Sequence, residues 1–251
     1  MKKAIVVVSF GSTIPSAREE LNRVEQYIGE ANPDRDLFCC YSSGFIRNKL
    51  MEAGIKIFSL EEILSTLSKE AYGDVFIQPT HVIPGIEYDK VNGIAEQFRS
   101  CFQRLVVGKP LLSEPEDIVA VSKILMKLYE QREEEALLLL GHGTEHTANF
   151  IYPALQTAFQ VNGGRRVYIA TVEGWPTLED AMKQMGNDHV KQVFVAPFLL
   201  CAGDHVKNDM LGDSEESFLN QLIKAGFSVR YTEKGLGRYP EILAYYRKEE
   251  N

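Results

Sequence analysis

The 251-residue sequence predicts an α/β protein made of two tandem Rossmann-like domains, each with a parallel four-stranded sheet flanked by helices. The apolar runs are short and continuous rather than alternating, which is typical of strands buried on both faces of a parallel sheet. Segments with helical spacing separate these runs, as in open α/β sheets. The order of runs then repeats in the second half of the chain. The length is sufficient for two such domains.

The expected strands are rich in Val, Ile, Leu and Phe and form two sets of four. The first set comprises residues 4–8, 37–41, 74–79 and 104–107, and the second comprises 136–140, 166–171, 192–197 and 227–231. The connections between strands predict helices. In the first connection, Leu21, Val24 and Ile28 recur at helical spacing. In the fourth, Ile118, Val121, Leu125 and Leu128 do the same.

The two halves match block by block, which indicates an internal duplication. AIVVVSFGS at 4–12 aligns with ALLLLGHGT at 136–144, and VFIQP at 75–79 aligns with VFVAP 118 residues later. We therefore predict two α/β halves, 1–131 and 132–251, joined at a charged stretch. Ligands of such sheets bind outside the carboxyl ends of the strands. The active site is accordingly expected in a cleft between the halves.

The halves differ from each other at the strand ends, and the second half places ligand-type side chains there. His142 follows its first strand, Glu173 its second and His205 its third, while Glu87 aligns with His205 in the first half. Two imidazoles and a carboxylate suit Co²⁺, Ni²⁺, Fe²⁺ or Zn²⁺ with positions left open for chemistry. Glycines on both sides of His142 allow close approach of the backbone. These residues predict a metal site, with Glu87 as a fourth carboxyl group or an acid–base group.

Each of these residues also has a simpler interpretation. A lone His142 could be an ordinary loop residue, Glu173 a turn carboxylate, and 203–205 a turn followed by a helix N-cap. Their joint occurrence at equivalent strand ends favours the metal site. His81 and His146 lie near the same loops and are weaker candidates.

Composition and motifs exclude several function classes. The net charge of −8 argues against nucleic acid and anionic membranes as partners. The apolar runs of about five residues are too short to span a bilayer or to serve as a secretory signal, so we expect a cytoplasmic protein. No P-loop or dinucleotide fingerprint is present, which predicts that neither ATP nor another nucleotide is used. The four cysteines form no CxxC pair and are expected to be reduced.

Four blocks together resemble a known family. The opening strand with SFGS, the ALLLLGHGT block, the TVEGWP block and the PFLLCAGDHVKND block are similar to anaerobic, ATP-independent cobaltochelatases of the CbiK type, relatives of ferrochelatase. Over essentially the whole chain, this resemblance implies a chelatase-like fold. It implies that His142, Glu173 and His205 bind the metal and that Glu87 is the cleft glutamate of that family. It also implies a cleft-side helix around 47–58.

The function implied by the resemblance is insertion of Co²⁺ into sirohydrochlorin or precorrin-2 during cobalamin synthesis. Fe²⁺, Ni²⁺ or Zn²⁺ could substitute for Co²⁺, because ligand type does not separate these metals. The catalytic residues would be His142, His205 and Glu87, with a histidine accepting pyrrole protons. Substrate contacts are predicted at Ser9, Phe10, Gly11 and Trp175. Candidates for steering the acidic groups of the substrate are Arg47, Lys90 and Lys207.

Three alternatives stay open from the sequence. The protein could be a ferrochelatase or nickel chelatase, a non-catalytic tetrapyrrole or metal carrier, or a generic α/β metallohydrolase. Catalytic turnover separates a chelatase from a carrier, and use of a tetrapyrrole separates it from a hydrolase. The family resemblance is compatible with a homo-oligomer, which the sequence itself neither supports nor opposes.

Overall fold

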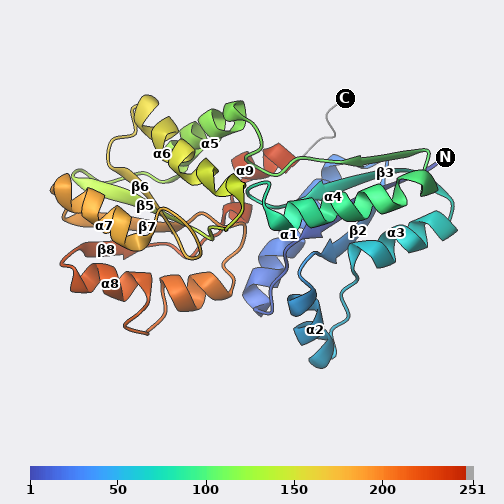
Figure 1. Ribbon diagram of the computed structural model, residues 1–251, viewed down its shortest axis with the longest axis horizontal. Coiled ribbons are helices and arrows are strands. Elements are labelled where there is room, and N and C mark those ends of the chain that lie inside the picture. Colours follow the sequence, from blue (N-terminus) through green and yellow to red (C-terminus); the bar gives the residue numbers. More distant parts are fainter. Residues whose placement is uncertain (247–251) are drawn as a thin grey trace. The chain divides into compact units, whose positions relative to one another are not determined.

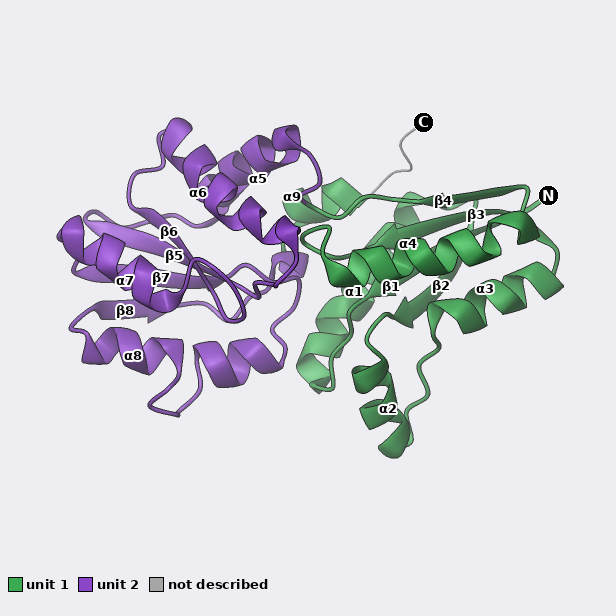
Figure 2. Ribbon diagram, viewed as in Figure 1, with its two compact units in different colours: residues 1–111, 239–251 green, residues 112–238 purple. Residues whose placement is uncertain are grey.

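The computed structural model describes residues 1–246 and divides the chain into two compact units (Figures 1 and 2). Unit 1 comprises residues 1–111 together with the segment from Tyr239 onward, and unit 2 comprises residues 112–238. Each unit contains one parallel four-stranded sheet, with strand order β2-β1-β3-β4 in unit 1 and β6-β5-β7-β8 in unit 2. The fold class predicted from the sequence is confirmed.

Unit 1 alternates strands and helices. Its elements are β1 (Lys2–Ser9), α1 (Pro15–Ala31), β2 (Asp36–Tyr41), α2 (Gly44–Glu52), α3 (Leu60–Lys69), β3 (Tyr72–Pro79), α4 (Ile86–Phe98), η1 (Arg99–Cys101), β4 (Arg104–Val107), α9 (Pro240–Leu243) and η5 (Ala244–Tyr246). Helices α3 and α4 cover one face of the sheet, where Val6 and Ile77 enter a shared core with Leu64. Helix α1 contacts β1 and β2.

Unit 2 has the same arrangement. Its elements are α5 (Pro115–Leu128), β5 (Glu135–Gly141), η2 (Thr147–Phe150), α6 (Ile151–Val161), β6 (Val167–Thr171), α7 (Leu178–Asn187), β7 (Gln192–Pro197), the π-helical turn η3 (Val206–Met210), α8 (Phe218–Lys224), β8 (Ser228–Tyr231) and η4 (Leu236–Arg238). Helices α5 and α6 lie together on one side of this sheet, and α7 and α8 lie on the other (Figure 1). The central strands β3 and β5 are buried at every position, as their continuous apolar runs predict.

Local features recur at equivalent positions of the two units. A capping box formed by Ser59 and Glu62 starts α3, and one formed by Thr177 and Asp180 starts α7, at the spacing of 118 residues found in the sequence. The same spacing separates Ala71 and His189, which both adopt a positive φ after these helices. The units thus share turn and cap geometry as well as strand order, which agrees with a duplicated origin.

Helix α2 lies earlier in the chain than the helix expected around 47–58. It begins at Gly44, where the Ser43 hydroxyl caps the first turn, and it ends at Glu52. Gly54 has a φ of +78° and donates its N–H to the Met51 carbonyl, while the next N–H bonds to the Leu50 carbonyl. This pair of bonds is a Schellman motif, which terminates the helix.

The last helix of each predicted half belongs to the other unit. Helix α5 packs on α6 in unit 2, whereas α9 contacts α1 in unit 1. The bounds of the compact units therefore differ from those of the predicted halves, 1–131 and 132–251. The two halves stay a prediction about the repeat in the sequence. Residues 247–251 lie outside the described part of the chain. Within residues 1–246, no helix has both the length and the apolar character needed to span a membrane.

Candidate metal centre

Three ligand-type side chains gather at the carboxyl ends of successive strands in unit 2. His142 directly follows β5, Glu173 comes shortly after β6, and His205 lies beyond β7 at the start of η3. One ligand atom from each lies within 4.8 Å of those of the other two. The structure thus brings together the three residues that the repeat singled out, and no other group of this kind occurs among residues 1–246.

Backbone pairing past the strand ends brings the first two ligands close. The Val172 N–H donates to the Gly141 carbonyl (3.1 Å), and the Glu173 N–H donates to the His142 carbonyl (2.7 Å). Gly143 has a φ of +82°, and a Cβ placed there would lie 2.6 Å from the backbone nitrogen of Gly174. Only a glycine at position 143 lets its loop lie this close to the loop of Glu173 and Gly174. Any larger residue would push the two loops apart.

Hydrogen bonds fix the tautomers of the two histidines. The Nδ1 atom of His142 lies 3.0 Å from the Gly143 carbonyl oxygen, which can only accept, so this nitrogen donates. The Nδ1 atom of His205 donates in the same way to the Asp209 carboxylate at 2.6 Å. In the neutral form of each ring the Nε2 atom then carries the free lone pair, and the two Nε2 atoms lie 3.0 Å apart. Two neutral imidazoles that present their Nε2 atoms to the same point are a donor pair that suits a metal ion.

The partial exposure of the three side chains and the negative charge of Glu173 also suit a site that a metal ion can enter and leave. The side chains of His142 and His205 are 35% and 32% exposed, and that of Glu173 is 61% exposed. A Glu173 carboxylate oxygen lies 3.8 Å from Nδ1 of His142. A permanent structural site would be closed by its ligands, whereas an open one leaves positions for a further ligand or a reactant.

Asp209 contacts the cluster through His205 and was not among the residues expected from the sequence. Its spacing of four residues from His205 is the available signal, because one helical turn places the two side chains on the same face. Carboxylates that accept a hydrogen bond from a metal-binding imidazole orient the ring and raise its basicity. Asp209 stands in this relation to His205.

Replacing Asp209 with Asn is expected to weaken Co²⁺ binding roughly 10- to 100-fold, as is usual when the partner of a ligating histidine is lost. A Co²⁺ titration followed by visible absorption measures the affinity. Asp204→Asn is the matched control, because Asp204 precedes the same turn and bonds to Asn208 instead of a histidine. Equal affinities of the two variants would remove Asp209 from the site.

In unit 1, Glu87 lies in the first turn of α4 and contacts several polar groups. Lys90 donates to one of its oxygens, and the Ser42 hydroxyl is a further hydrogen-bond partner. Partial burial favours the protonated carboxyl, but Lys90 and Ser42 outweigh it and hold the pKa below its usual range. Burial lowers the pKa of the neighbouring His81 to about 4, against the opposing effect of the Glu87 charge. Near neutral pH the pair is therefore a carboxylate beside a neutral imidazole.

The predicted substrate contacts differ in accessibility. Trp175 is 50% exposed and Phe10 is 45% exposed, so both aromatic rings are available to a ligand. Ser9 is buried and its hydroxyl accepts a hydrogen bond from Thr80. Gly11 has a φ of +100°, as its counterpart Gly143 has a positive φ in unit 2, but it packs against the Tyr41 ring rather than against a neighbouring backbone. Contact of these residues with a substrate stays a prediction, as does the cleft between the halves.

The other histidines that the sequence offered lie outside the cluster. His146 starts η2, where its Nδ1 atom accepts a hydrogen bond from the Ala148 N–H. His81 belongs to unit 1, where its Nε2 atom lies 3.4 Å from the Ser42 hydroxyl. Neither residue joins the group around His142.

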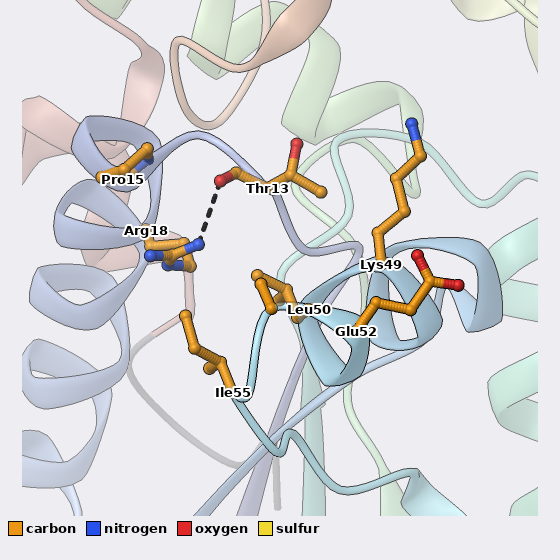
Figure 3. A pocket seen from close by; sticks show the side chains of 8 residues that line it. Thr13, Pro15, Arg18, Lys49, Leu50, Glu52 and Ile55 are labelled. Atoms are coloured by element: carbon orange, nitrogen blue, oxygen red, sulfur yellow. Dashed lines mark hydrogen bonds between the residues drawn. The ribbon is translucent and has the colours of Figure 1, made fainter.

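Two pockets indent unit 1. One, of about 480 Å³, lies between α1 and α2, where Arg18 bonds to the Thr13 carbonyl across from Leu50 and Ile55 (Figure 3). The other, of about 390 Å³, lies at the carboxyl ends of β1 and β2 and is lined in part by Ser42, Arg47 and Lys90. Each pocket is lined by two basic residues and one carboxylate, which are Arg18, Lys49 and Glu52 in the first and Arg47, Lys90 and Glu61 in the second.

Comparisons with known proteins agree on one family. The family model described as cobalt chelatase (CbiK) matches residues 3–249. A sirohydrochlorin cobaltochelatase of Salmonella typhimurium is 33% identical over 98% of this chain and 94% of its own length, and sirohydrochlorin cobaltochelatase CbiKC of Nitratidesulfovibrio vulgaris is 30% identical over 95% and 86%. Among solved structures, SirB from Bacillus subtilis with Fe³⁺ has a TM-score of 0.65 at 16% identity, covering 98% of this chain and 93% of its own.

Proposed function

Because this chain belongs to the cobalt chelatase (CbiK) family, we propose that it inserts Co²⁺ into sirohydrochlorin without ATP, as a step of cobalamin synthesis. The observation that carries the proposal is the close approach of the Nε2 atoms of His142 and His205, with a Glu173 ligand atom in the same group. Such a donor set accepts a first-row divalent ion and leaves coordination positions open. Sirohydrochlorin is the substrate named for both curated relatives.

The proposed reaction exchanges two pyrrole protons for one metal ion. His142 and His205 hold Co²⁺ through Nε2, and Glu173 compensates part of its charge. As the ring nitrogens replace the protein ligands, the two N–H protons leave the macrocycle. A histidine nitrogen released by the metal regains its lone pair and can accept one of these protons, and Glu87 can accept the other. The net process consumes no nucleotide.

Glu87 is proposed to accept a pyrrole proton. Its carboxylate is ionised at neutral pH because Lys90 and Ser42 lower its pKa. One of its oxygens, Oε2, is buried and has no hydrogen-bond partner among residues 1–246, so it has an acceptor site to spare. The lowered pKa makes Glu87 a weaker base than a free glutamate, but it keeps the carboxylate ionised and ready to accept a proton, which it then releases to solvent.

Replacing Glu87 with Gln is expected to slow insertion by about 10²- to 10⁴-fold, the usual contribution of a general base, and to leave Co²⁺ affinity unchanged. Single-turnover absorbance measures the insertion rate, and a titration measures metal affinity. Asp89→Asn removes a carboxylate from the same helical turn and serves as the control. A wild-type rate in Glu87→Gln would remove this residue from the catalytic set.

The decisive experiment is an anaerobic absorbance time course with the purified protein, sirohydrochlorin and Co²⁺, beside a protein-free control and an Fe²⁺ series. The proposal expects many turnovers per protein with Co²⁺ preferred. A preference for Fe²⁺ would assign the protein to siroheme synthesis instead. A spectral change that stops at one equivalent would mean a carrier, and no change with any metal would refute chelatase activity.

A further inference from the structure

The pocket of about 390 Å³ in unit 1 contains a guanidinium group that forms no ion pair among residues 1–246. Arg47 lies in the first turn of α2, is half-buried and lines this pocket. Within residues 1–246, no carboxylate lies within ion-pair distance of it. Burying a charge without a counter-charge is unfavourable, and a cation near a helix N-terminus is also opposed by the helix dipole. An anion in the pocket would relieve both effects.

The Arg47 side chain is held in place by the protein before any ligand arrives. Its Nη1 atom donates to the carbonyl oxygens of Tyr41 and, at 3.1 Å, Ser42, at the end of β2. These two bonds leave Nε and Nη2 without a partner among the described residues. Two neighbouring guanidinium donors match the two oxygens of a carboxylate. The fixed orientation reduces the entropy lost when such a ligand binds.

The other groups of the pocket suit one acidic arm of a larger molecule. Lys90 is largely exposed and bonds to Glu87 through one of its three N–H donors, which leaves donors for a ligand. Val91 and Ile94 supply apolar surface for methylene groups, and the Glu61 carboxylate also lines the pocket without forming an ion pair with Arg47. The volume lies at the lower end of the range for ligand pockets, so it suits a side chain rather than a whole macrocycle.

We infer that this pocket binds a carboxylate side chain of the tetrapyrrole substrate, with Arg47 as its bidentate partner. The inference rests on the proposed function for the identity of the ligand. According to this inference, the Arg47 guanidinium of unit 1 contributes to the affinity for the substrate and does not bind the metal. Loss of Arg47 should therefore weaken substrate binding and leave Co²⁺ binding intact.

The test compares Arg47→Gln and Arg47→Lys with the wild-type protein and with Arg18→Gln. Metal-free sirohydrochlorin is titrated into each protein under anaerobic conditions and followed by its fluorescence. If Arg47 forms a charged hydrogen-bonded contact, the affinity of Arg47→Gln for sirohydrochlorin should be about 10- to 100-fold lower than that of the wild type. Arg47→Lys should lose an intermediate amount, because lysine keeps the positive charge but lacks the two parallel N–H donors of the guanidinium group. Arg18 lines the other pocket and bonds to a carbonyl, so its replacement should leave affinity unchanged.

Two further measurements make each outcome decisive. Circular dichroism and Co²⁺ affinity should be unchanged in the Arg47 variants, and the fully esterified tetrapyrrole should bind equally to wild type and Arg47→Gln. If Arg47→Gln binds the free acid as tightly as wild type, the inference is wrong while the chelatase proposal stands. Arg47-dependent binding without turnover would reject the chelatase proposal alone. If the wild-type protein binds no tetrapyrrole, both are rejected.

Discussion

Replacing His142 with Ala is expected to abolish cobalt insertion, so that the rate equals that of the protein-free control. The variant removes one of the two Nε2 donors and leaves His205 facing an empty position. Co²⁺ affinity should fall by more than the roughly 100-fold loss that accompanies removal of an outer partner, because a direct ligand is lost. The side chain is partly exposed, so the free energy of unfolding should change little.

The measurement combines the anaerobic insertion assay with a Co²⁺ titration and thermal unfolding. His189→Asn is a suitable control, since His189 is exposed in the same unit and its positive φ is tolerated by Asn. The control should retain full activity and affinity. Wild-type turnover by a folded His142→Ala protein would exclude this residue from the mechanism.

Replacing Gly143 with Ala is expected to destabilise unit 2 and disrupt the metal site together. A left-handed backbone costs an L-residue about 1–2 kcal/mol. In addition, the new Cβ would lie 2.6 Å from the nitrogen of Gly174 and 2.8 Å from the carbonyl carbon of Glu173, both backbone atoms. Because these atoms cannot turn aside as a side chain can, the loops must separate. We expect a total loss of about 3 kcal/mol or more, and weaker Co²⁺ binding.

Gly163→Ala provides a matched control for this prediction. Gly163 has a φ of +87° in the same unit, but a Cβ added there meets no atom within 4 Å. Its replacement should cost only the conformational strain, about 1–2 kcal/mol, and should not alter Co²⁺ affinity. Urea unfolding and a Co²⁺ titration measure both quantities. Equal losses in the two variants would mean that the contact between the Gly143 and Gly174 loops does not position the ligands.

The strands and the metal cluster could be predicted because both depend on local patterns. Continuous apolar runs identify doubly buried strands, and the carboxyl ends of neighbouring parallel strands converge, so His142, Glu173 and His205 had to lie close once the order of strands was known. The comparison of the two halves placed the three residues after three successive strands of the chain, and the structure gives the order of those strands in the sheet. The repeat thus carried more information than any single motif.

Other features depend on interactions that a pattern does not encode. Helices 115–128 and 240–243 are amphipathic or apolar segments that would fit either sheet, and nothing local shows that each packs in the unit of the other half. Ser9 is the last residue of β1 and is buried there, where its hydroxyl accepts a hydrogen bond from Thr80. Asp209 is one acidic residue among several in its segment until the His205 ring is seen to donate to it.

The assignment of the last helix to unit 1 has a consequence for synthesis of the chain. Unit 2 is continuous in sequence, so it can fold as soon as residue 238 has left the ribosome. Unit 1 starts first, but Tyr246 fills its interior and donates to the carbonyls of Thr80 and His81, more than 160 residues earlier. Contacts so distant along the chain form slowly. The contacts of Tyr246 with the loop that precedes Glu87 therefore form only after residue 246 has been synthesised, whereas Thr80 can bond to Val8 and Ser9 before that.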